Sequence, residues 1–367
     1  MANTSQANMS SSPFTVDIQI GVSVFASLLF LVSLIGNIVV IYIVCTRAHM
    51  RNSTNILIAN MAIGDLLLTI DIPYIIKWLF VFHAWFGSNF FADFLCKFFH
   101  SVQMGSIACS VFTLVAISFD RCFAITYPLR KVLVGKVLKA TIAGIWLFSL
   151  SFCTPLIIVT QARASHGHSI CAEFWDDFPS INHRYFIVAF SICTYIMPLV
   201  LIAVVYLITG IRLWQRKLPG NENLLAKEKV HATSRKATIM LVTVVLVFAI
   251  CWLPLQVREV LKFYEAPFEV PIKVDIILPW IGFSNIAINP ILYIIFSENY
   301  RSEFLSILCC KQIKKHSFYN ASPMSTPMIS RAMTERSRLS PSPDVNRHLL
   351  SPSSIQLKPL KNGPLPE

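Results

Sequence analysis

The 367-residue sequence carries little charge for its length. Only 14% of its residues are Asp, Glu, Lys or Arg, whereas soluble globular proteins average about 25%. Residues 1–19 contain no Lys or Arg and no apolar core, so they lack the pattern of a cleavable signal peptide. The apolar runs further along show no apolar/polar alternation, which argues against the strands of a membrane β-barrel. Neither a soluble domain nor a barrel is therefore expected.

What the sequence has instead is a series of long apolar runs. Each is long enough to cross roughly 30 Å of hydrocarbon as a helix, and backbone groups in lipid must be paired within the segment. We therefore predict an all-α membrane protein with a seven-transmembrane helix bundle. Its spans are expected at residues 20–45, 55–80, 94–122, 137–160, 185–213, 237–261 and 274–296. The first span would also serve as the insertion signal.

The sequence also predicts what surrounds the bundle. Residues 1–19 form an N-terminal tail, 20–297 the bundle, and 298–310 a short amphipathic helix on the membrane surface. Residues 311–367 are rich in Ser, Pro, Lys and Arg and poor in aromatic residues, which is typical of a disordered tail.

The distribution of Lys and Arg predicts the orientation of the chain. With the N-terminus outside, eighteen basic residues between Arg47 and Lys315 lie on the inner side. Seven lie on the outer side: Lys77, Lys97, Arg163, Arg184, Arg258, Lys262 and Lys273. Basic residues collect on the cytoplasmic side of membrane proteins, so we expect an extracellular N-terminus and a cytoplasmic C-terminus. The same bias explains the net charge of +12 without nucleic acid as a partner. Asn3 and Asn8 begin glycosylation sequons in the outer tail.

Two of the ten cysteines face the oxidising exterior in this topology. Cys96 lies at the start of span three and Cys171 in the loop after span four, so a disulfide is expected between them, with two free thiols as the alternative. Cys309 and Cys310 end the amphipathic segment and are candidates for palmitoylation, although unmodified cysteines are an alternative.

Placing a polar side chain in the hydrocarbon costs free energy, so polar residues at that depth are candidates for function. Asp65, Ser110, Asn285 and Asn289 lie at middle depth in spans two, three and seven. If they converge, their oxygens suit a hard cation such as Na⁺. The alternative is a hydrogen-bonded network without an ion.

A second group of polar residues lies at the inner end of span three. Asp120 and Arg121 stand at its inner end, where the Arg can pair locally or be released to a partner. The alternative is the ordinary excess of basic residues on the inner side.

Span six contains an aromatic stripe that ends in polar residues. Phe248, Trp252, Gln256 and Glu259 share one helical face, and the last two lie toward the outer mouth. Aromatic stripes are usually packing, but a packing surface has no need of Gln and Glu. We therefore expect a ligand pocket above Trp252.

Taken together, these motifs resemble the rhodopsin-type (class A) G-protein-coupled receptors over residues 20 to about 310. The matching positions, in chain order, are Gly36-Asn37, Asn60, Ala62, Asp65, the Asp120-Arg121-Cys122 triplet (Cys in place of the usual Tyr), Trp146, Pro198, Tyr206, Phe248 through Pro254, and Asn289 through Tyr293. No enzymatic activity is implied.

The resemblance implies a plasma-membrane receptor and assigns roles to several residues. Arg121 would engage a heterotrimeric G protein, with Tyr206 and Tyr293 swinging toward it. Pro198, Val111 and Phe248 would relay changes in the pocket, and Leu129 would insert into the G protein. Arrestin and receptor kinases would act on the cytoplasmic tail, and membrane lipid would surround the bundle.

The resemblance also narrows the ligand. The position of the amine receptors' Asp is Gln103 here, and the position of the opsins' Lys is Phe283. Gln103 is frequent among neuropeptide receptors, most similarly those for RFamide and galanin/allatostatin-like peptides. The outer segments carry Glu173, Asp176, Asp177, Glu259, Glu265, Glu269 and Asp275.

Acidic residues at the mouth would attract a cationic or amidated peptide, unless they are only solvated loop residues. Three alternatives stay open: a receptor for a lipid or other small molecule, an orphan constitutively active receptor, and, more distantly, a transporter or channel.

Overall fold

The computed structural model describes residues 14–80, 85–127, 132–165, 168–215, 224–264 and 271–308. The chain divides into two units, residues 1–313 and 314–367, and every described residue lies in the first. Five of the predicted site residues lie outside the described residues: Asn3, Asn8, Leu129, Cys309 and Cys310.

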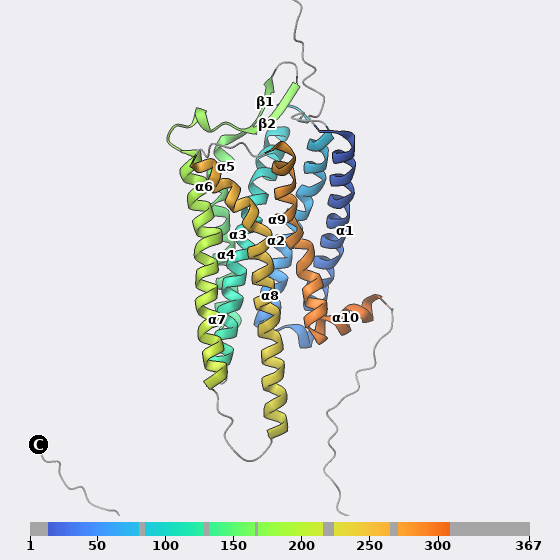
Figure 1. Cartoon of the computed structure of the whole chain (residues 1–367), viewed down its shortest axis with the longest axis vertical. Coiled ribbons are helices and arrows are strands. Elements are labelled where there is room, and N and C mark those ends of the chain that lie inside the picture. The colour runs from blue at the N-terminus through green and yellow to red at the C-terminus, as the bar shows by residue number, and fades with distance from the viewer. Residues whose placement is uncertain are drawn as a thin grey trace, which may run out of the picture. The chain divides into compact units, whose positions relative to one another are not determined.

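Seven helical spans, each long and apolar enough to cross a membrane, form the described part of the chain (Figure 1). The first three are α1 (Val16–Thr46), α2 (Ser53–Phe80) and α3 (Phe90–Thr126). The fourth combines α4 (Gly135–Ser151) and α5 (Cys153–Val159), and the fifth combines α6 (His183–Ser191), the π-helical turn η3 (Ile192–Ile196) and α7 (Met197–Gln215). The last two are α8 (Leu224–Phe263) and α9 (Ile272–Phe296). The predicted seven-helix architecture is confirmed.

Prolines account for two interruptions that the hydropathy pattern did not predict. Pro155 has no N–H to donate to the carbonyl of Ser151, and the fourth span breaks at the turn residue Phe152 between them. Pro198 likewise has no N–H for the carbonyl of Thr194, which lies inside the π-helical turn.

Shorter elements complete the described fold. The 3₁₀ turn η1 (Ala48–Met50) joins α1 to α2, and η2 (Trp175–Asp177) follows a two-stranded hairpin, β1 (Thr160–Ser165) with β2 (His168–Glu173). The helix α10 (Glu298–Leu308) follows α9 directly and coincides closely with the predicted amphipathic segment. We refer below to the hairpin end of the bundle, where β1 and β2 lie, and to the α10 end opposite it (Figure 1).

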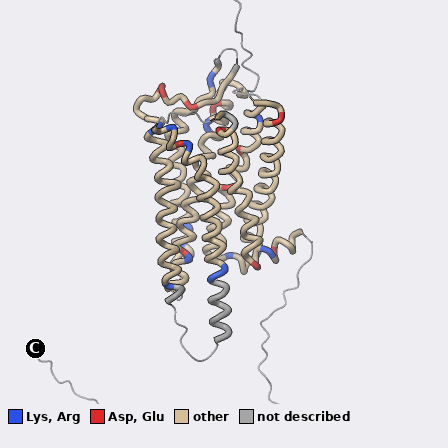
Figure 2. The backbone as a smooth tube through the Cα atoms, in the orientation of Figure 1, with Lys and Arg blue, Asp and Glu red and all other residues tan. Residues whose placement is uncertain are grey.

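The polarity of the bundle is the reverse of that of a soluble protein. Large apolar side chains point outward, with Leu28 58% and Leu147 72% exposed, whereas Asn37 and Thr69 are fully buried. Figure 2 shows most charged residues gathered toward the two ends, with uncharged residues along the middle of the helices. Such a surface suits hydrocarbon as the surrounding medium.

Close approach of the backbones holds α1 against α9. A Cβ added at Gly36 would lie 2.7 Å from the Cβ of Pro290, so only glycine fits there. At the next contact, Asn37 donates a hydrogen bond to the carbonyl of Ile286 over 3.1 Å. These contacts place α9 where its polar residues face α2 and α3.

Candidate functional site

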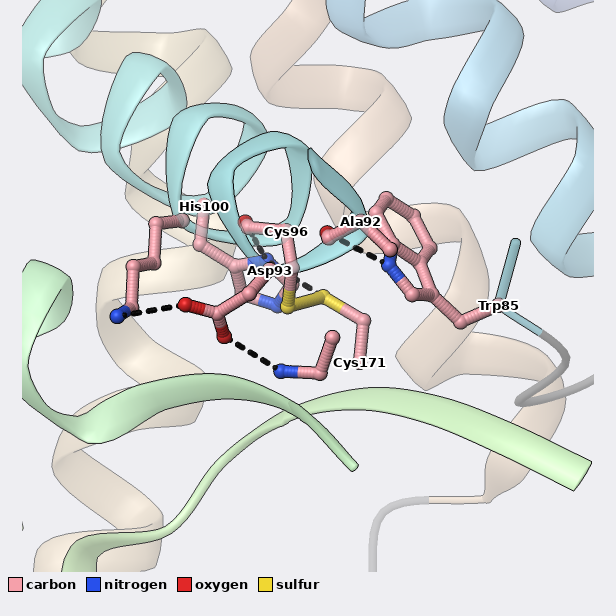
Figure 3. Close-up of a disulfide and its surroundings, with 8 residues drawn as sticks. Trp85, Ala92, Asp93, Cys96, His100 and Cys171 are labelled. Carbon is pink, nitrogen blue, oxygen red and sulfur yellow. Dashed lines mark hydrogen bonds and ion pairs between the residues drawn. A yellow bond between two sulfur atoms is a disulfide. The ribbon is translucent and has the colours of Figure 1, made fainter. Parts of the chain in front are cut away.

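A disulfide ties the hairpin to α3 at the hairpin end (Figure 3). Cys96 and Cys171 are bonded with their Cα atoms 5.7 Å apart, and Cys171 pairs with Ala162 across the hairpin. The Asp93 carboxylate accepts the backbone N–H of Ala162 over 2.9 Å, and the backbone N–H of Trp85 donates to the Ser169 carbonyl over 2.6 Å. The hairpin, the start of α3 and the segment just before α3 thus meet around the disulfide.

The Asp65 carboxylate lies in the middle of the bundle and is 1% exposed. Ser110 donates a hydrogen bond to one of its oxygens over 3.0 Å, and Asn289 donates to the other over 2.9 Å. Asn285 lies one turn before Asn289 and is 3% exposed. The side-chain oxygens of both asparagines have no hydrogen-bond partner among the described residues. The Asp65 carboxylate, the Ser110 hydroxyl and the Asn289 amide therefore lie together, and Asn285 lies one turn away on the same helix.

Asp71 is a second intramembrane acid that the sequence reasoning missed. It lies six residues after Asp65 in α2 and is 3% exposed, and its Oδ1 has no hydrogen-bond partner among the described residues. Tyr74, one turn further along α2, stacks on Phe99 of α3 with ring centroids 5.0 Å apart. The rule that singled out Asp65, a charged residue within a span, would have found Asp71 as well.

Trp252 lies beneath the hairpin end and is 2% exposed. A Cβ at Gly282 would lie 3.0 Å from its ring, so α8 and α9 are in close contact there. Gln103, Gln256 and Glu259 are half-buried. The sequence placed Gln256 and Glu259 on the face of Trp252, toward this end.

Arg258 neutralises part of the acidic mouth, which the sequence did not predict. Its guanidinium bonds both carboxylate oxygens of Asp275, over 2.8 Å for the Nη2–Oδ2 pair, and also bonds Glu259. This links the end of α8 to the start of α9. The positive charge of Lys262, one turn further along α8, also acts on Asp275.

The three loop acids lie together in a separate place. Glu173, Asp176 and Asp177 line a cavity of 630 Å³ formed by residues 173–184, and this cavity has no lining residue from α3, α8 or α9. Glu173 accepts from the Trp175 indole N–H over 2.7 Å, and Asp177 is paired with Arg163. Asp176 is exposed and has no such partner among the described residues.

The Asp120–Arg121 pair at the α10 end is held by the start of α2. Arg121 lies 3.1 Å from the Asp120 carboxylate. The Thr54 hydroxyl donates to Asp120 and accepts from Arg121, so it bridges the two charges. Ser53 donates to the other oxygen of Asp120 over 2.9 Å. Neither Ser53 nor Thr54 belonged to the predicted site, because nothing in the local sequence places α2 beside this pair.

We call the contacts among Thr54, Asp120 and Arg121 the clasp. A cavity of 430 Å³ opens beside the clasp at the α10 end. Arg121, Lys236, Met240 and Tyr300 are among its lining residues, which come from α2, α3, α8, α9 and α10. Lys236 pairs with Glu298 over 2.9 Å across its rim. Burial raises the pKa of the Tyr300 hydroxyl well above its usual range, so this group stays protonated.

The remaining predicted residues lie between the two ends. Val111 and Phe248 are 0% and 1% exposed, and Pro198 is also buried. Phe248 lies against Tyr195, with the ring centroids 6.3 Å apart. Tyr195 itself lies one turn before Pro198. The hydroxyls of Tyr206 and Tyr293 have no hydrogen-bond partner among the described residues.

Comparison with known proteins agrees with this arrangement. Residues 36–293 match the family described as 7 transmembrane receptor (rhodopsin family). The chain is 32% identical over 292 residues to the RYamide receptor of Drosophila melanogaster, covering 76% of this chain and 61% of that receptor. It is 30% identical over 312 residues to the Substance-K receptor of Mesocricetus auratus, covering 83% and 79%. Identity to the Tachykinin-like peptides receptor 99D of Drosophila melanogaster is 32% over 328 residues, covering 85% and 60%.

The chain belongs to the rhodopsin family of seven-transmembrane receptors, the G-protein-coupled receptors that its motifs resemble. It is accordingly a multi-pass plasma-membrane protein and a receptor, not an enzyme. The matched region spans less than two thirds of the length of the two Drosophila receptors.

Proposed function

We propose that this protein is activated by an extracellular neuropeptide with a cationic or amidated end and passes the signal to a heterotrimeric G protein. The hairpin end faces outward and the α10 end faces the cytoplasm. The observation that carries the peptide is the acidity of the hairpin end, where Asp176 is exposed and has no ion-pair partner among the described residues. The names of the relatives, which include receptors for RYamide and for tachykinin-like peptides, support the same class of ligand.

Two regions would share the ligand in this proposal. The open loop cavity with Asp176 attracts the cationic part, and Gln103, Gln256 and Glu259 contact the end that enters the bundle above Trp252.

A peptide panel tests this directly. Cells expressing the full chain are exposed to amidated and cationic neuropeptides, and calcium and cAMP are recorded. Asp176→Asn should weaken the response to the active peptide. Asp17→Asn, at the exposed start of α1, should leave that response unchanged. Silence to every peptide together with a response to lipids would overturn the proposal in favour of a receptor for a lipid or other small molecule.

The G protein would bind in the cavity at the α10 end. Arg121 lines that cavity and is held by Thr54 and Asp120, so it is available once that clasp opens. Leu129 would contribute a further contact, and Tyr206 and Tyr293 would turn toward Arg121. Arg121→Ala should abolish coupling at unchanged surface expression. Signalling that survives this change, or transport of a solute, would favour a transporter or channel.

We also propose a sodium ion at Asp65. The charge of Asp65, the Ser110 hydroxyl and the two free amide oxygens of Asn285 and Asn289 fit a hard monovalent cation. These four side chains would hold it, and the ion would supply the positive charge that the buried carboxylate lacks.

Modification and regulation complete the proposal. Glycans would be attached at Asn3 and Asn8, and palmitate at Cys309 and Cys310. Arrestin and receptor kinases would act on the cytoplasmic tail.

A further inference from the structure

A cavity of 380 Å³ lies among α2, α3, α4 and α5, apart from the two ends. Three of its lining side chains belong to the outward-facing apolar surface: Phe94 is 55% exposed, Leu150 is 54% and Ile157 is 47%. Since that surface faces hydrocarbon, the cavity opens to the membrane. A ligand would reach it through the lipid.

Unpaired hydroxyls surround this cavity. Ser101, Ser106 and Ser149 line it and are 9%, 3% and 0% exposed, and none of their hydroxyls has a hydrogen-bond partner among the described residues. A buried serine in a helix can donate to the carbonyl one turn earlier, as Ser118 does over 2.8 Å to Leu114. Buried polar groups rarely stay unpaired, so three around one cavity indicate a ligand with a hydrogen-bonding group.

The charged residue of the cavity is already neutralised. Lys97 lines the cavity toward the hairpin end and lies 2.8 Å from the Asp93 carboxylate, one turn earlier on α3. A ligand carboxylate here would be repelled by Asp93, and a ligand ammonium would be repelled by Lys97. A neutral hydroxyl can accept from Lys97 and donate to the Ser101 oxygen without disturbing the ion pair.

The spacing along α3 sets the length of the ligand. Lys97 and Ser106 are nine residues apart, which at about 1.5 Å per residue is roughly 13 Å. Ser101 lies one turn after Lys97 and belongs to the same end of the cavity, while Val102 and Gly105 lie between Ser101 and Ser106 and contribute no polar side chain; Phe98 lies on the same stretch. The ligand is therefore apolar in the middle and carries a hydrogen-bonding group near each end.

We propose that this cavity binds a neutral sterol that carries a second hydroxyl on its side chain. The ring hydroxyl bonds Lys97 and Ser101, the rings lie along Phe98 and Val102, and the side-chain hydroxyl bonds Ser106 and Ser149. A fatty acid would place a carboxylate beside Asp93. A sterol without the second hydroxyl would leave both serines unpaired.

Saturation binding to the full chain in phosphatidylcholine nanodiscs tests the site. The probe is tritiated cholesterol with a hydroxyl on its side chain, and the competitors are plain cholesterol and oleic acid. We expect saturable binding and at least tenfold weaker competition by both competitors. Absence of saturable binding overturns the site, and equal competition by cholesterol or oleic acid overturns the assigned ligand.

Serine variants then locate the hydroxyl contact. Ser106→Ala and Ser149→Ala should each weaken sterol binding by about threefold to tenfold, the value of one hydrogen bond. The matched control is Ser151→Ala, because Ser151 lies two residues from Ser149 on the same span but is exposed and bonds the Phe148 carbonyl over 2.6 Å. Binding that falls equally in the control contradicts the proposal.

Thermal unfolding separates ligand contact from damage to the fold. Ser149→Ala removes a hydroxyl that is unpaired in the described structure, so the sterol-free receptor should unfold at the same or a higher temperature. The rise in unfolding temperature caused by sterol should shrink in the same variant. A lower unfolding temperature without sterol would show that the hydroxyl serves the fold, and would refute the assigned contact.

Discussion

Removal of the Thr54 hydroxyl should raise the ligand-free activity of this receptor. In the described conformation this hydroxyl donates to Asp120 and accepts from Arg121, so Thr54→Val breaks both bonds while nearly keeping the volume. Arg121 then keeps only the Asp120 contact over 3.1 Å and is freer to meet a G protein. Because the clasp belongs to this conformation, its loss shifts the equilibrium away from it.

The size of the effect follows from the two bonds. Hydrogen bonds to charged groups contribute about 1.5–3 kcal/mol each, and the Arg121 side chain is 24% exposed, so water replaces part of what is lost. A net change of about 1.4–2.8 kcal/mol is roughly a tenfold to hundredfold shift in the equilibrium. A receptor that is about 1% active without ligand would become about 9% to 50% active.

Nucleotide exchange on a purified G protein, with matched amounts of receptor in nanodiscs and no ligand, measures this activity. Ser53→Ala should give a smaller rise, because Ser53 bonds Asp120 and not Arg121. Thr46→Val is the matched control, since the exposed Thr46 bonds only the Tyr42 carbonyl over 2.7 Å. Exchange by Thr54→Val at the unmodified rate, or an equal rise in Thr46→Val, would refute the reasoning.

Three further predictions concern other parts of the bundle. Cys96→Ala should lower surface expression or peptide affinity, because the disulfide closes a separation of 75 residues and is worth about 4 kcal/mol by loop entropy; a normally expressed, fully binding variant would contradict this. Gly36→Val should destabilise the receptor by about 1–3 kcal/mol or more, since its Cβ would lie 2.7 Å from Pro290, whereas Gly21→Val, with nothing within 4 Å, should unfold at the normal temperature. Asp65→Asn should abolish any effect of NaCl on agonist affinity, tested against KCl at equal ionic strength; a sodium effect that persists would remove the ion from Asp65.

Hydropathy was sufficient to predict the seven helices, because lipid requires every span to be helical whatever its side chains. It was not sufficient for the internal geometry of the spans, because a proline such as Pro198 is compatible with both a kink and a π-helical turn. Ser110 and Asn289 converge on Asp65, which the sodium hypothesis required of them, while Asp71 was overlooked although the same rule covers it.

Ion pairs between segments that are separated along the chain could not be predicted from the sequence. Asp177 is bonded to Arg163 because the hairpin folds back on η2, and Asp275 is bonded to Arg258 because α8 ends beside α9. Read along the chain, both acids looked available to a ligand. The structure leaves Asp176 exposed, so the acidic mouth is smaller than the composition of its loops indicated.

The unpaired polar groups at the α10 end explain how such a clasp can act as a switch. The hydroxyls of Tyr206, Tyr293 and Tyr300 and the Nε of Arg121 are buried without hydrogen-bond partners among the described residues. Each unpaired group costs about 1–3 kcal/mol, so they oppose the contacts that Thr54 and Asp120 make. An arrangement that brings Arg121 to the tyrosines would pair these groups but lose the clasp. The contacts that favour the two arrangements therefore oppose one another, and a ligand that binds one of them more tightly shifts the equilibrium toward it.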